Sequence, residues 1–436
     1  MKILTLISRL IIGSLFIVSG LIKANDPTGF AYKLEEYFSP DVLNLEWLIP
    51  YALFMAVLIC IGEIVLGVAA IMGAKIKLVS GLLLLMMLFF TFLTFYSAYF
   101  EKVTDCGCFG DAIKLSPWQS FYKDVVLLVL VIFLFIQRNR INANTFTLDI
   151  ILAFSSILLI AGFAGGYIGW HFPIYFTLLL FALIILLKKA SFLPERSALI
   201  IISISLLFSC GFSFYVIRHL PIKDFRPYKL GTFIPDKMKD CNDLQLPCPE
   251  YKVVYTLAKL GSGETKEVSS DDYIAEKIWE DKSWEIVTDK TQSILVEKGY
   301  EPPIQDFIIS GFDGEDVTDM VLTDSKPIFW VIAYDIMNQN NITASGQIDK
   351  LVNQSDTLDW KVYGLTASTY ENTEAYRHQV QAMYDYFTAD EKVLKTIIRS
   401  NPGIVLMKKG TILGKWHYND LPEIDQLKAD FFNKKS

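Results

Sequence analysis

Seven long apolar segments in the first half of the 436-residue chain constrain its fold more than any other feature. Each approaches the roughly 20 residues that an α-helix needs to cross about 30 Å of hydrocarbon. Because a helix satisfies its own backbone hydrogen bonds in lipid, we predict seven transmembrane helices. They cover about residues 3–22, 47–73, 78–100, 118–137, 148–168, 172–188 and 198–217, and the first is expected to be retained rather than cleaved as a signal.

Charge divides the chain at the same place as hydropathy. Residues 1–218 contain 15 Lys and Arg and 12 Asp and Glu, whereas residues 219–436 contain 25 and 35, so the net charge changes from +3 to −10. Such a shift indicates that lipid solvates the first half and water the second. Because the second half is acidic and has no basic cluster, nucleic-acid binding is not expected.

Lysines and arginines in the short loops predict the orientation of the bundle. If the N-terminus is cytoplasmic, the loops on its side are basic and those on the other side are mixed or acidic. The basic loop residues include Lys75, Lys77, Arg138, Arg140, Lys188 and Lys189, and the residues of the opposite loops include Asp26, Glu35, Glu36 and Asp41. An odd number of spans then places the second half outside the cytoplasm.

Two charged residues fall inside the predicted spans, Arg9 in the first and Glu63 in the second. Counted from the cytoplasmic ends at 1.5 Å per residue, their depths differ by only about 5 Å. Because an unpaired charge in lipid is costly, we predict that Arg9 and Glu63 pair across a helix interface. Such a pair is either a structural lock between two helices or a site for a proton or a quinone head group.

The sequence Cys106-Gly107-Cys108 lies in the predicted outer loop between the third and fourth spans. A disulfide closed over one residue has non-ideal geometry and is easily reduced, and glycine supplies the backbone freedom that the small ring needs. The pair is therefore a candidate for redox exchange, and a structural disulfide that staples the loop is the alternative. A metal site is not expected because no histidine lies within about 60 residues.

The remaining four cysteines fall into two groups. Cys60 and Cys210 stand in apolar spans, where a lone cysteine is usually a small packing residue. Cys241 and Cys248 lie near the start of the second half, on the side where disulfides persist, and are predicted to form a loop disulfide. Alternatively, they relay disulfides to and from the Cys-Gly-Cys pair.

Residues 3–137 resemble the DoxX family and, more specifically, the methylamine utilisation protein MauE. The resemblance rests on the sequence from Arg9 to Lys23, on Glu63 in Gly-Glu-Ile-Val-Leu-Gly, and on Cys-Gly-Cys-Phe-Gly followed by Trp118–Asp124. It implies a four-helix membrane domain concerned with disulfide or redox chemistry at the outer face of a bacterial inner membrane. The extra spans and the large second half depart from this family, so methylamine metabolism does not carry over.

The chain as a whole is similar to Bacteroidetes proteins that join a DoxX-like membrane domain to an outer thioredoxin-like domain. Residues 218–229 and 398–406 look like their signatures. In the second half we expect strands at 251–257, 284–287, 327–334, 361–365, 403–407 and 412–416, and helices at 342–355, 371–397 and 421–433. From residue 327 onward this is the β-α-β-α-β-β-α order of thioredoxin, and Pro402 stands where that family keeps a cis-proline.

The expected thioredoxin-like domain lacks the reactive cysteines of its family. Thioredoxin-like enzymes carry Cys-x-x-Cys at the first strand-to-helix turn, where the helix N-terminus lowers the pKa of the thiol. Here that turn is Asp335–Asn341, and no cysteine follows Cys248. His378 and His417 are far apart in sequence and are not expected to form a catalytic pair. The domain is therefore predicted to bind or scaffold other proteins.

We accordingly predict a four-helix membrane domain at 1–140, additional transmembrane helices at 141–218, a small β-rich linker at 219–320 and an α/β thioredoxin-like domain at 321–436. The first functional hypothesis is a multi-pass inner-membrane redox-accessory protein that exchanges disulfides with periplasmic client or assembly proteins through Cys106 and Cys108. The second is a non-catalytic envelope protein whose thioredoxin-like domain scaffolds partners. Besides the lipid bilayer, the expected partners are proteins, and no metal is expected.

Overall fold

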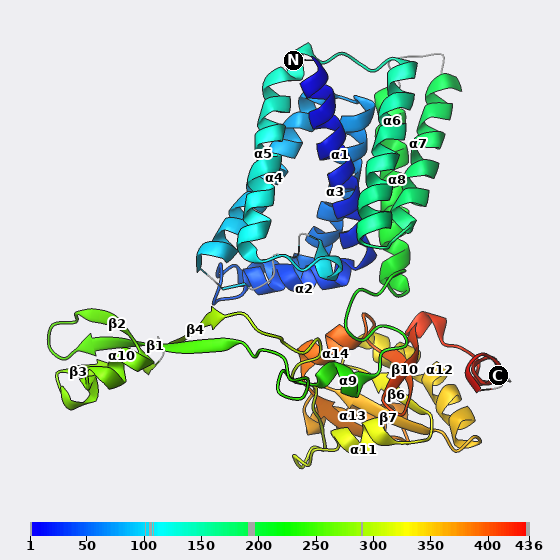
Figure 1. The fold of residues 1–436 in the computed structure, drawn as a ribbon. Helices are drawn as coiled ribbons and strands as arrows, with labels where there is room; N and C mark the ends of the chain where they lie inside the picture. The colour runs from blue at the N-terminus through cyan, green and yellow to red at the C-terminus, as the bar shows by residue number, and fades with distance from the viewer. Residues whose placement is uncertain are drawn as a thin grey trace.

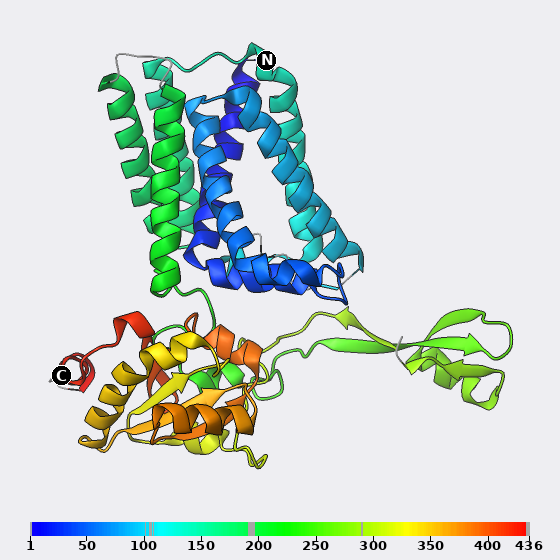
Figure 2. The same cartoon turned by 180° about the vertical axis from the view of Figure 1, so that it is seen from behind.

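The structure is a computed structural model that describes residues 2–100, 102–103, 107, 109–190, 197–288 and 291–432. The chain forms a helical bundle with an α/β domain beneath one end, from which a small β-sheet projects sideways (Figures 1 and 2). Seven helices among the described residues are long and apolar enough to cross a membrane. The predicted fold class, an α-helical membrane bundle followed by an α/β domain, is confirmed.

Seven helices run along the bundle and one lies across its end. The shorter helix, α2, is amphipathic and was not predicted from the sequence. The helices are α1 (Lys2–Asn25), α2 (Pro27–Phe38), α3 (Ala52–Met72), α4 (Ile76–Phe100), α5 (Pro117–Gln137), α6 (Phe146–Ile160), α7 (Phe172–Ala190) and α8 (Ser197–Arg218). Figure 1 shows α2 lying flat between the bundle and the α/β domain.

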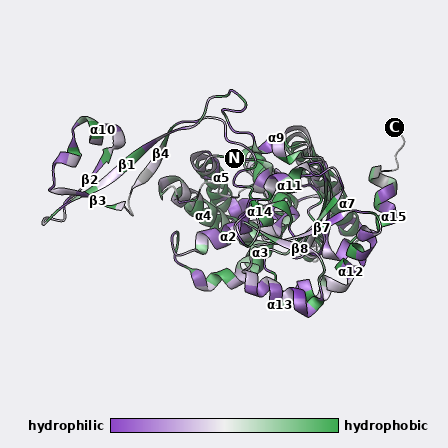
Figure 3. Ribbon diagram, turned by 90° about the horizontal axis from the view of Figure 1, so that it is seen from below, coloured by the Kyte–Doolittle hydropathy of each residue, from purple (hydrophilic) through white to green (hydrophobic). Residues whose placement is uncertain are grey.

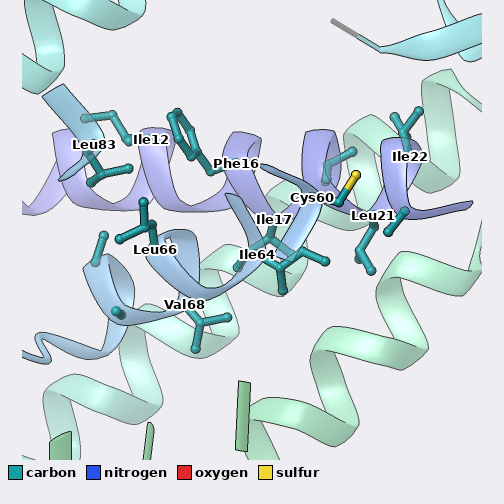
Figure 4. Packing of buried hydrophobic residues seen from close by; sticks show 14 of the residues in the cluster. Ile12, Phe16, Ile17, Leu21, Ile22, Cys60, Ile64, Leu66, Val68 and Leu83 are labelled. Atoms are coloured by element: carbon teal, nitrogen blue, oxygen red, sulfur yellow. The ribbon is translucent and has the colours of Figure 1, made fainter. Parts of the chain in front are cut away.

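Helices α1 and α3 form the tightest contact of the bundle because glycines let their backbones touch. A Cβ atom added to Gly67 would lie 2.7 Å from the carbonyl oxygen of Gly13, and one added to Gly13 would lie 2.8 Å from that of Gly67. Small residues at such crossings are the usual means of close helix packing in membranes. Around them, large apolar side chains of both helices interlock, among them Phe16 and Ile64 (Figure 4).

The predicted ion pair between Arg9 and Glu63 is wrong. The guanidinium of Arg9 instead donates hydrogen bonds to the carbonyl oxygens of Ala70 and Ile71, at 2.8 and 2.9 Å, and to Asn144 Oδ1 at 2.8 Å. The last carbonyls of a helix have no partner within it and carry the negative end of its dipole. Arg9 therefore caps the C-terminus of α3, about two turns beyond Glu63.

The capping arginine belongs to a polar cluster at the end of the bundle that is distant from the α/β domain. Asn144 donates a hydrogen bond to Asp149 Oδ1 at 2.9 Å, and Lys188 forms an ion pair with the other oxygen of Asp149. Asp149 is buried, and its partners come from two other parts of the chain. The cluster thus fastens α1, α3, α6 and α7 together at this end.

The α/β domain is built on a six-stranded sheet of order β10-β9-β6-β7-β8-β5. β6, β7 and β8 are parallel, and β9, β10 and β5 are antiparallel to their neighbours. The strands are β5 (Ile309–Ser310), β6 (Ile328–Ile332), β7 (Lys361–Thr366), β8 (Asp385–Ala389), β9 (Gly403–Lys408) and β10 (Thr411–His417). β8 divides the region 371–397, which was predicted to be entirely helical.

Each face of this sheet has its own hydrophobic core, because successive side chains of a strand point to opposite faces. In β6, Trp330 belongs to one core and Phe329 to the other. The Trp330 face is covered by α9 (Ile234–Met238), α11 (Thr318–Thr323) and α14 (Glu391–Ile397), and the Phe329 face by α12 (Gln339–Asp356), α13 (Tyr370–Val380) and α15 (Ile424–Leu427).

The region 219–320 is not one separate unit. Tyr228, Ile234, Ile304 and Phe307 pack into the Trp330 core of the α/β domain. The part in between forms an antiparallel sheet with one short helix, which we call the arm. It consists of β1 (Glu250–Lys259), β2 (Thr265–Ser269), α10 (Ser270–Ala275), β3 (Trp284–Ile286) and β4 (Gln292–Glu297). Seen from below, the arm points away from the rest of the molecule (Figure 3).

Replacing Gly67 with alanine is expected to destabilise the bundle by about 1–3 kcal/mol, because the added methyl group meets the backbone of α1. Unfolding in mixed detergent micelles, followed by circular dichroism, measures this change. Gly81→Ala is the matched control, since the nearest atom to a Cβ there is 3.8 Å away. Equal stability of the two variants would show that the close glycine contact contributes nothing.

Candidate functional site

A chamber of about 660 Å³ lies between the end of the bundle and the α/β domain. Four segments that are far apart in the sequence form its walls. They are the stretch from Ile22 to Ser39 at the end of α1 and in α2, the loop from Gly107 to Lys114, the segment Pro221–Arg226 after α8, and α14 with the residues up to Arg399. Because both domains line it, the chamber exists only while they are docked.

Helix α2 forms the floor of the bundle and one wall of the chamber. Asp26 caps its N-terminus by accepting a hydrogen bond from the backbone N–H of Gly29 at 2.8 Å, and Pro27 occupies the first turn, where its missing N–H costs nothing. The buried face holds Phe30, Leu34 and Phe38, spaced at helical intervals. The opposite face therefore carries polar residues toward the chamber.

An ion pair between Asp26 and Arg399 joins the two domains. Arg399 Nε donates to Asp26 Oδ1 and Oδ2 at 3.0 and 2.9 Å, and Arg399 also lies 3.9 Å from Asp111. Although burial opposes its charge, the carboxylate of Asp26 raises the pKa of Arg399. A partly buried, charge-assisted contact of this kind is stronger than an exposed surface pair.

A tyrosine pair makes the second contact between the domains. The hydroxyl groups of Tyr32 in α2 and Tyr334 after β6 are 3.1 Å apart, and the ammonium of Lys395 lies 4.4 Å from the ring centre of Tyr32. Burial raises the pKa of both tyrosines, so both hydroxyls remain neutral. We call the two contacts, Asp26–Arg399 and Tyr32–Tyr334, the latch.

The latch uses the part of the α/β domain that carries the cysteines in thioredoxin-like enzymes. Tyr334 directly precedes the turn at Asp335, and Asn401 donates a hydrogen bond to the carbonyl oxygen of Asp335 at 2.8 Å. The peptide bond between Asn401 and Pro402 is cis, at the position expected from the resemblance. This face of the domain is therefore in contact with α2.

The predicted redox cysteines, Cys106 and Cys108, lie outside the described residues, but the residues beside them are placed. Gly107 is buried and lines the chamber, and its φ of 67° is a conformation that favours glycine. Phe109 is buried in the bundle, with Lys123 Nζ 5.0 Å from its ring centre. Gly107 thus lies in the chamber wall, and Phe109, two residues later, packs in the bundle.

Glu63 pairs with Lys23 instead of Arg9. Lys23 Nζ lies 2.6 Å from Glu63 Oε1 and 2.7 Å from Ser19 Oγ, and both charged side chains are almost completely buried. Among the described residues, Glu63 Oε2 has no hydrogen-bond partner. It borders an inner cavity of about 30 Å³ that Asp124 also lines. Because about 10–15 Å³ holds one water molecule, this inner cavity has room for about two.

Lys23 lines both the inner cavity and the chamber. Its ammonium also lies 4.8 Å from the ring centre of Phe90 and 5.6 Å from that of Phe30. Two aromatic faces and a carboxylate compensate for the loss of water around this buried charge. Lys23 is therefore a residue common to the walls of the inner cavity and the chamber.

The other predicted site residues are placed as follows. Cys241 and Cys248 form a disulfide, as predicted, at the base of the arm. Cys60 is buried and Cys210 is exposed. No cluster of three or more metal-binding side chains occurs among the described residues. Within the described part of the chain, His378 is exposed near Glu374, whereas His417 is buried and accepts a hydrogen bond from the N–H of Asn419.

A buried charge cluster fixes the chain where it enters the α/β domain. Asp224 accepts hydrogen bonds from Arg226 Nε at 2.7 Å and from Lys415 Nζ at 2.6 Å. Burial alone would raise the pKa of Asp224, but Arg226 and Lys415 hold it well below its usual value. Burial and the charge of Arg226 lower the pKa of Lys415 to about 7.

The geometry agrees with a comparison of the sequence with known families. The sequence model of the methylamine utilisation protein MauE matches residues 1–137. Residues 1–137 are a MauE-family membrane domain. Helices α1 to α5 form it, so the floor of the chamber, the inner cavity and the Cys-Gly-Cys-Phe-Gly loop all belong to this domain.

Two individual proteins are each similar to a part of the chain. Protein TlpB of Flavobacterium psychrophilum is 24% identical over 162 residues, which are 34% of this chain and 41% of that protein. The chain thus spans about two fifths of the length of this relative. The solution structure of a candidate protein disulfide isomerase from Bacteroides thetaiotaomicron matches 28% of this chain and 81% of its own, with 20% identity and a TM-score of 0.22.

Sequence reasoning missed Lys23, Asp26 and Tyr32, although part of the signal was present. Asp26-Pro27 is a typical helix start, and apolar residues follow at helical spacing. Lys23 was misleading because a lysine near the end of a span usually extends toward water. Here its side chain turns back to Glu63. No sequence signal connects Asp26 with Arg399.

Replacing Lys23 with methionine is expected to destabilise the bundle by about 3–5 kcal/mol, because a buried carboxylate loses its partner. The double variant Lys23→Met/Glu63→Leu is expected to recover most of this loss, since it removes both charges. Detergent unfolding monitored by circular dichroism measures both. Equal instability of the single and double variants would show that Lys23 does not stabilise the bundle through Glu63.

The stability of the α/β domain is expected to rise between about pH 7 and about pH 9. In this range unfolded Lys415 keeps its proton, whereas folded Lys415, with its pKa lowered to about 7, has released it. Because the unfolded state then binds more protons, raising the pH favours folding. Tryptophan fluorescence during denaturant unfolding measures this slope. Lys415→Met is expected to flatten it, and an unchanged slope would contradict the assignment.

Proposed function

We propose that this protein carries out thiol–disulfide exchange in the chamber through Cys106 and Cys108. The observation that carries the proposal is the position of Gly107, the residue between the two cysteines, in the chamber wall. A cysteine pair closed over one glycine is easily reduced. The chamber gives such a pair a defined space in which to meet a partner thiol or disulfide.

The exchange needs only the cysteine pair and its partner. A thiolate of the reduced pair attacks one sulfur of the partner disulfide, that S–S bond breaks, and the departing thiolate takes a proton from water. The thiolate of the second cysteine then displaces the partner, which leaves as a thiol, and the Cys106–Cys108 bond forms. Two electrons pass to the partner, and the reverse sequence oxidises a partner dithiol.

We propose that the chamber faces the periplasm of a bacterial inner membrane and that the N-terminus is cytoplasmic. The basic loop residues Lys75, Lys77, Arg138 and Arg140 support this orientation under the positive-inside rule. The Cys241–Cys248 disulfide on the α/β side supports it independently, since disulfides persist in oxidising compartments. The α/β domain, which has no cysteine of its own after Cys248, would close the chamber rather than react.

A second candidate function is a non-catalytic scaffold of the cell envelope. One observation favours it: the turn after Tyr334 has no cysteine and is in contact with α2. In that case the Cys-Gly-Cys pair staples its loop, and the free surfaces of the α/β domain and the arm bind partner proteins.

The reduction potential of the Cys106/Cys108 pair distinguishes these functions. Thiol trapping of the full-length protein in graded glutathione buffers, followed by mass spectrometry, measures it. We expect a potential near or above about −200 mV, the range of known disulfide oxidants and isomerases.

A potential below about −300 mV, or no disulfide at all, would favour the scaffold. Cys106→Ser and Cys108→Ser provide the second measurement, because the remaining thiolate of an exchanging pair is expected to trap mixed disulfides. The Cys241→Ser/Cys248→Ser double variant is the control, since it removes a disulfide outside the chamber.

A further inference from the structure

The latch borders the chamber. Asp26–Arg399 and Tyr32–Tyr334 bridge the bundle and the α/β domain, and Asp26, Tyr32 and Arg399 line the chamber together with residues of the segment Pro221–Arg226. A chamber of about 660 Å³ lies within the range of small-molecule pockets, roughly 300–1,000 Å³. It has room for a short peptide and none for a folded domain.

The charges of the chamber wall suit a ligand that carries both signs. Most wall charges are already paired with one another, such as Lys33 with Glu36 and Lys395 with Glu391. Lys114 and Lys392 are exposed, and each has no ion pair within the described part of the chain. They offer ammonium groups to ligand carboxylates. Glu35, half-buried on the same wall, offers a carboxylate to a ligand ammonium.

Burial raises the pKa of Glu35, and the positive charge of Lys395 opposes this shift. A ligand ammonium beside Glu35 would restore part of the stabilisation that water no longer supplies. The described wall therefore offers ammonium groups and a carboxylate that are not engaged in ion pairs, a pattern complementary to a short peptide with free carboxylates and an amine.

We propose that the chamber binds a short cysteine peptide, which is either a free low-molecular-weight thiol or an unfolded segment of a longer chain, and that the latch excludes folded proteins. The exchange reaction in this inference rests on the proposed function, whereas the binding of the peptide to the chamber does not. The reacting bond is a disulfide of this peptide, exchanged with the Cys106/Cys108 pair as described above.

The exchange rate of the reduced full-length protein in lipid nanodiscs tests the exclusion. The probes are glutathione disulfide, a linear peptide carrying a disulfide to glutathione, and an excess of oxidised protein disulfide isomerase, a folded protein with an exposed, readily reduced disulfide. We expect the two small probes to react and the folded isomerase to react at least about tenfold more slowly. Reaction of only one small probe identifies whether the peptide is free or part of a chain.

Opening the latch is expected to remove the exclusion. Arg399→Leu is predicted to speed the reaction with the folded isomerase at least about tenfold and to change the rate with glutathione disulfide by less than about threefold. Asp26→Asn opens the same contact from the membrane domain, in case Arg399→Leu folds poorly. Lys326→Met is the matched control, because it removes an ion pair of the α/β domain that lies outside the chamber wall. An unchanged rate with the folded isomerase in both latch variants would overturn the proposal.

Binding without reaction separates this proposal from the proposed function. The serine analogue of glutathione has no thiol, so its binding, measured by NMR line broadening, does not depend on exchange. We expect binding to the wild type and at least about threefold weaker binding to a Lys114→Met/Lys392→Met variant. Absence of binding would overturn the site, whereas binding without any exchange would overturn only the redox function.

Discussion

The buried ammonium of Lys23 is the charge around which the functional end of the molecule is organised. It pairs with Glu63 inside the bundle, lies near two aromatic rings, and lines both the inner cavity and the chamber. Helix α1 ends two residues after Lys23, and Asp26 then caps the start of α2, which runs in a new direction. An isolated charge at this depth would cost several kcal/mol, so the pairing with Glu63 fixes how α1 and α3 align.

The α/β domain has a strand-to-helix turn without cysteine beside a cis-proline loop. The strand-to-helix turn and the cis-proline loop remain adjacent, joined by the hydrogen bond from Asn401 to Asp335. The position next to this turn is occupied by a tyrosine that contacts α2. A surface that meets substrates in a thioredoxin-like enzyme thus meets the membrane domain of the same chain.

The parts of the structure that could be predicted are those with a strong local signal. Seven spans follow from length and hydropathy, and β6 and β9 from short buried runs between turns. β8 was missed because the region 371–397 reads as helical throughout. Depth alone suggested a pair of Arg9 and Glu63, but depth does not determine which way a side chain points around its helix. The α3 carbonyls and Lys23 were better partners for these two charges.

The chamber itself was beyond prediction, because its walls come from segments with no shared pattern. Gly107 suggested reactivity nearby, and the α/β fold suggested a binding domain, but only the docked arrangement brings them together. The disulfide between Cys241 and Cys248 could be predicted because the two residues are only 7 positions apart, so the pairing does not depend on distant parts of the fold. Contacts such as Asp26–Arg399 depend on the whole fold.

The Asp26–Arg399 contact also sets the order of events when the protein is made. The two residues are 373 positions apart, so at about 5–20 residues per second a ribosome needs roughly 20 to 75 seconds between them. The six spans that follow Asp26 are synthesised within that interval. During biosynthesis the membrane domain therefore exists first with its α2 end uncovered, and the chamber residues of this domain, such as Gly107, are exposed until the last tenth of the chain is made.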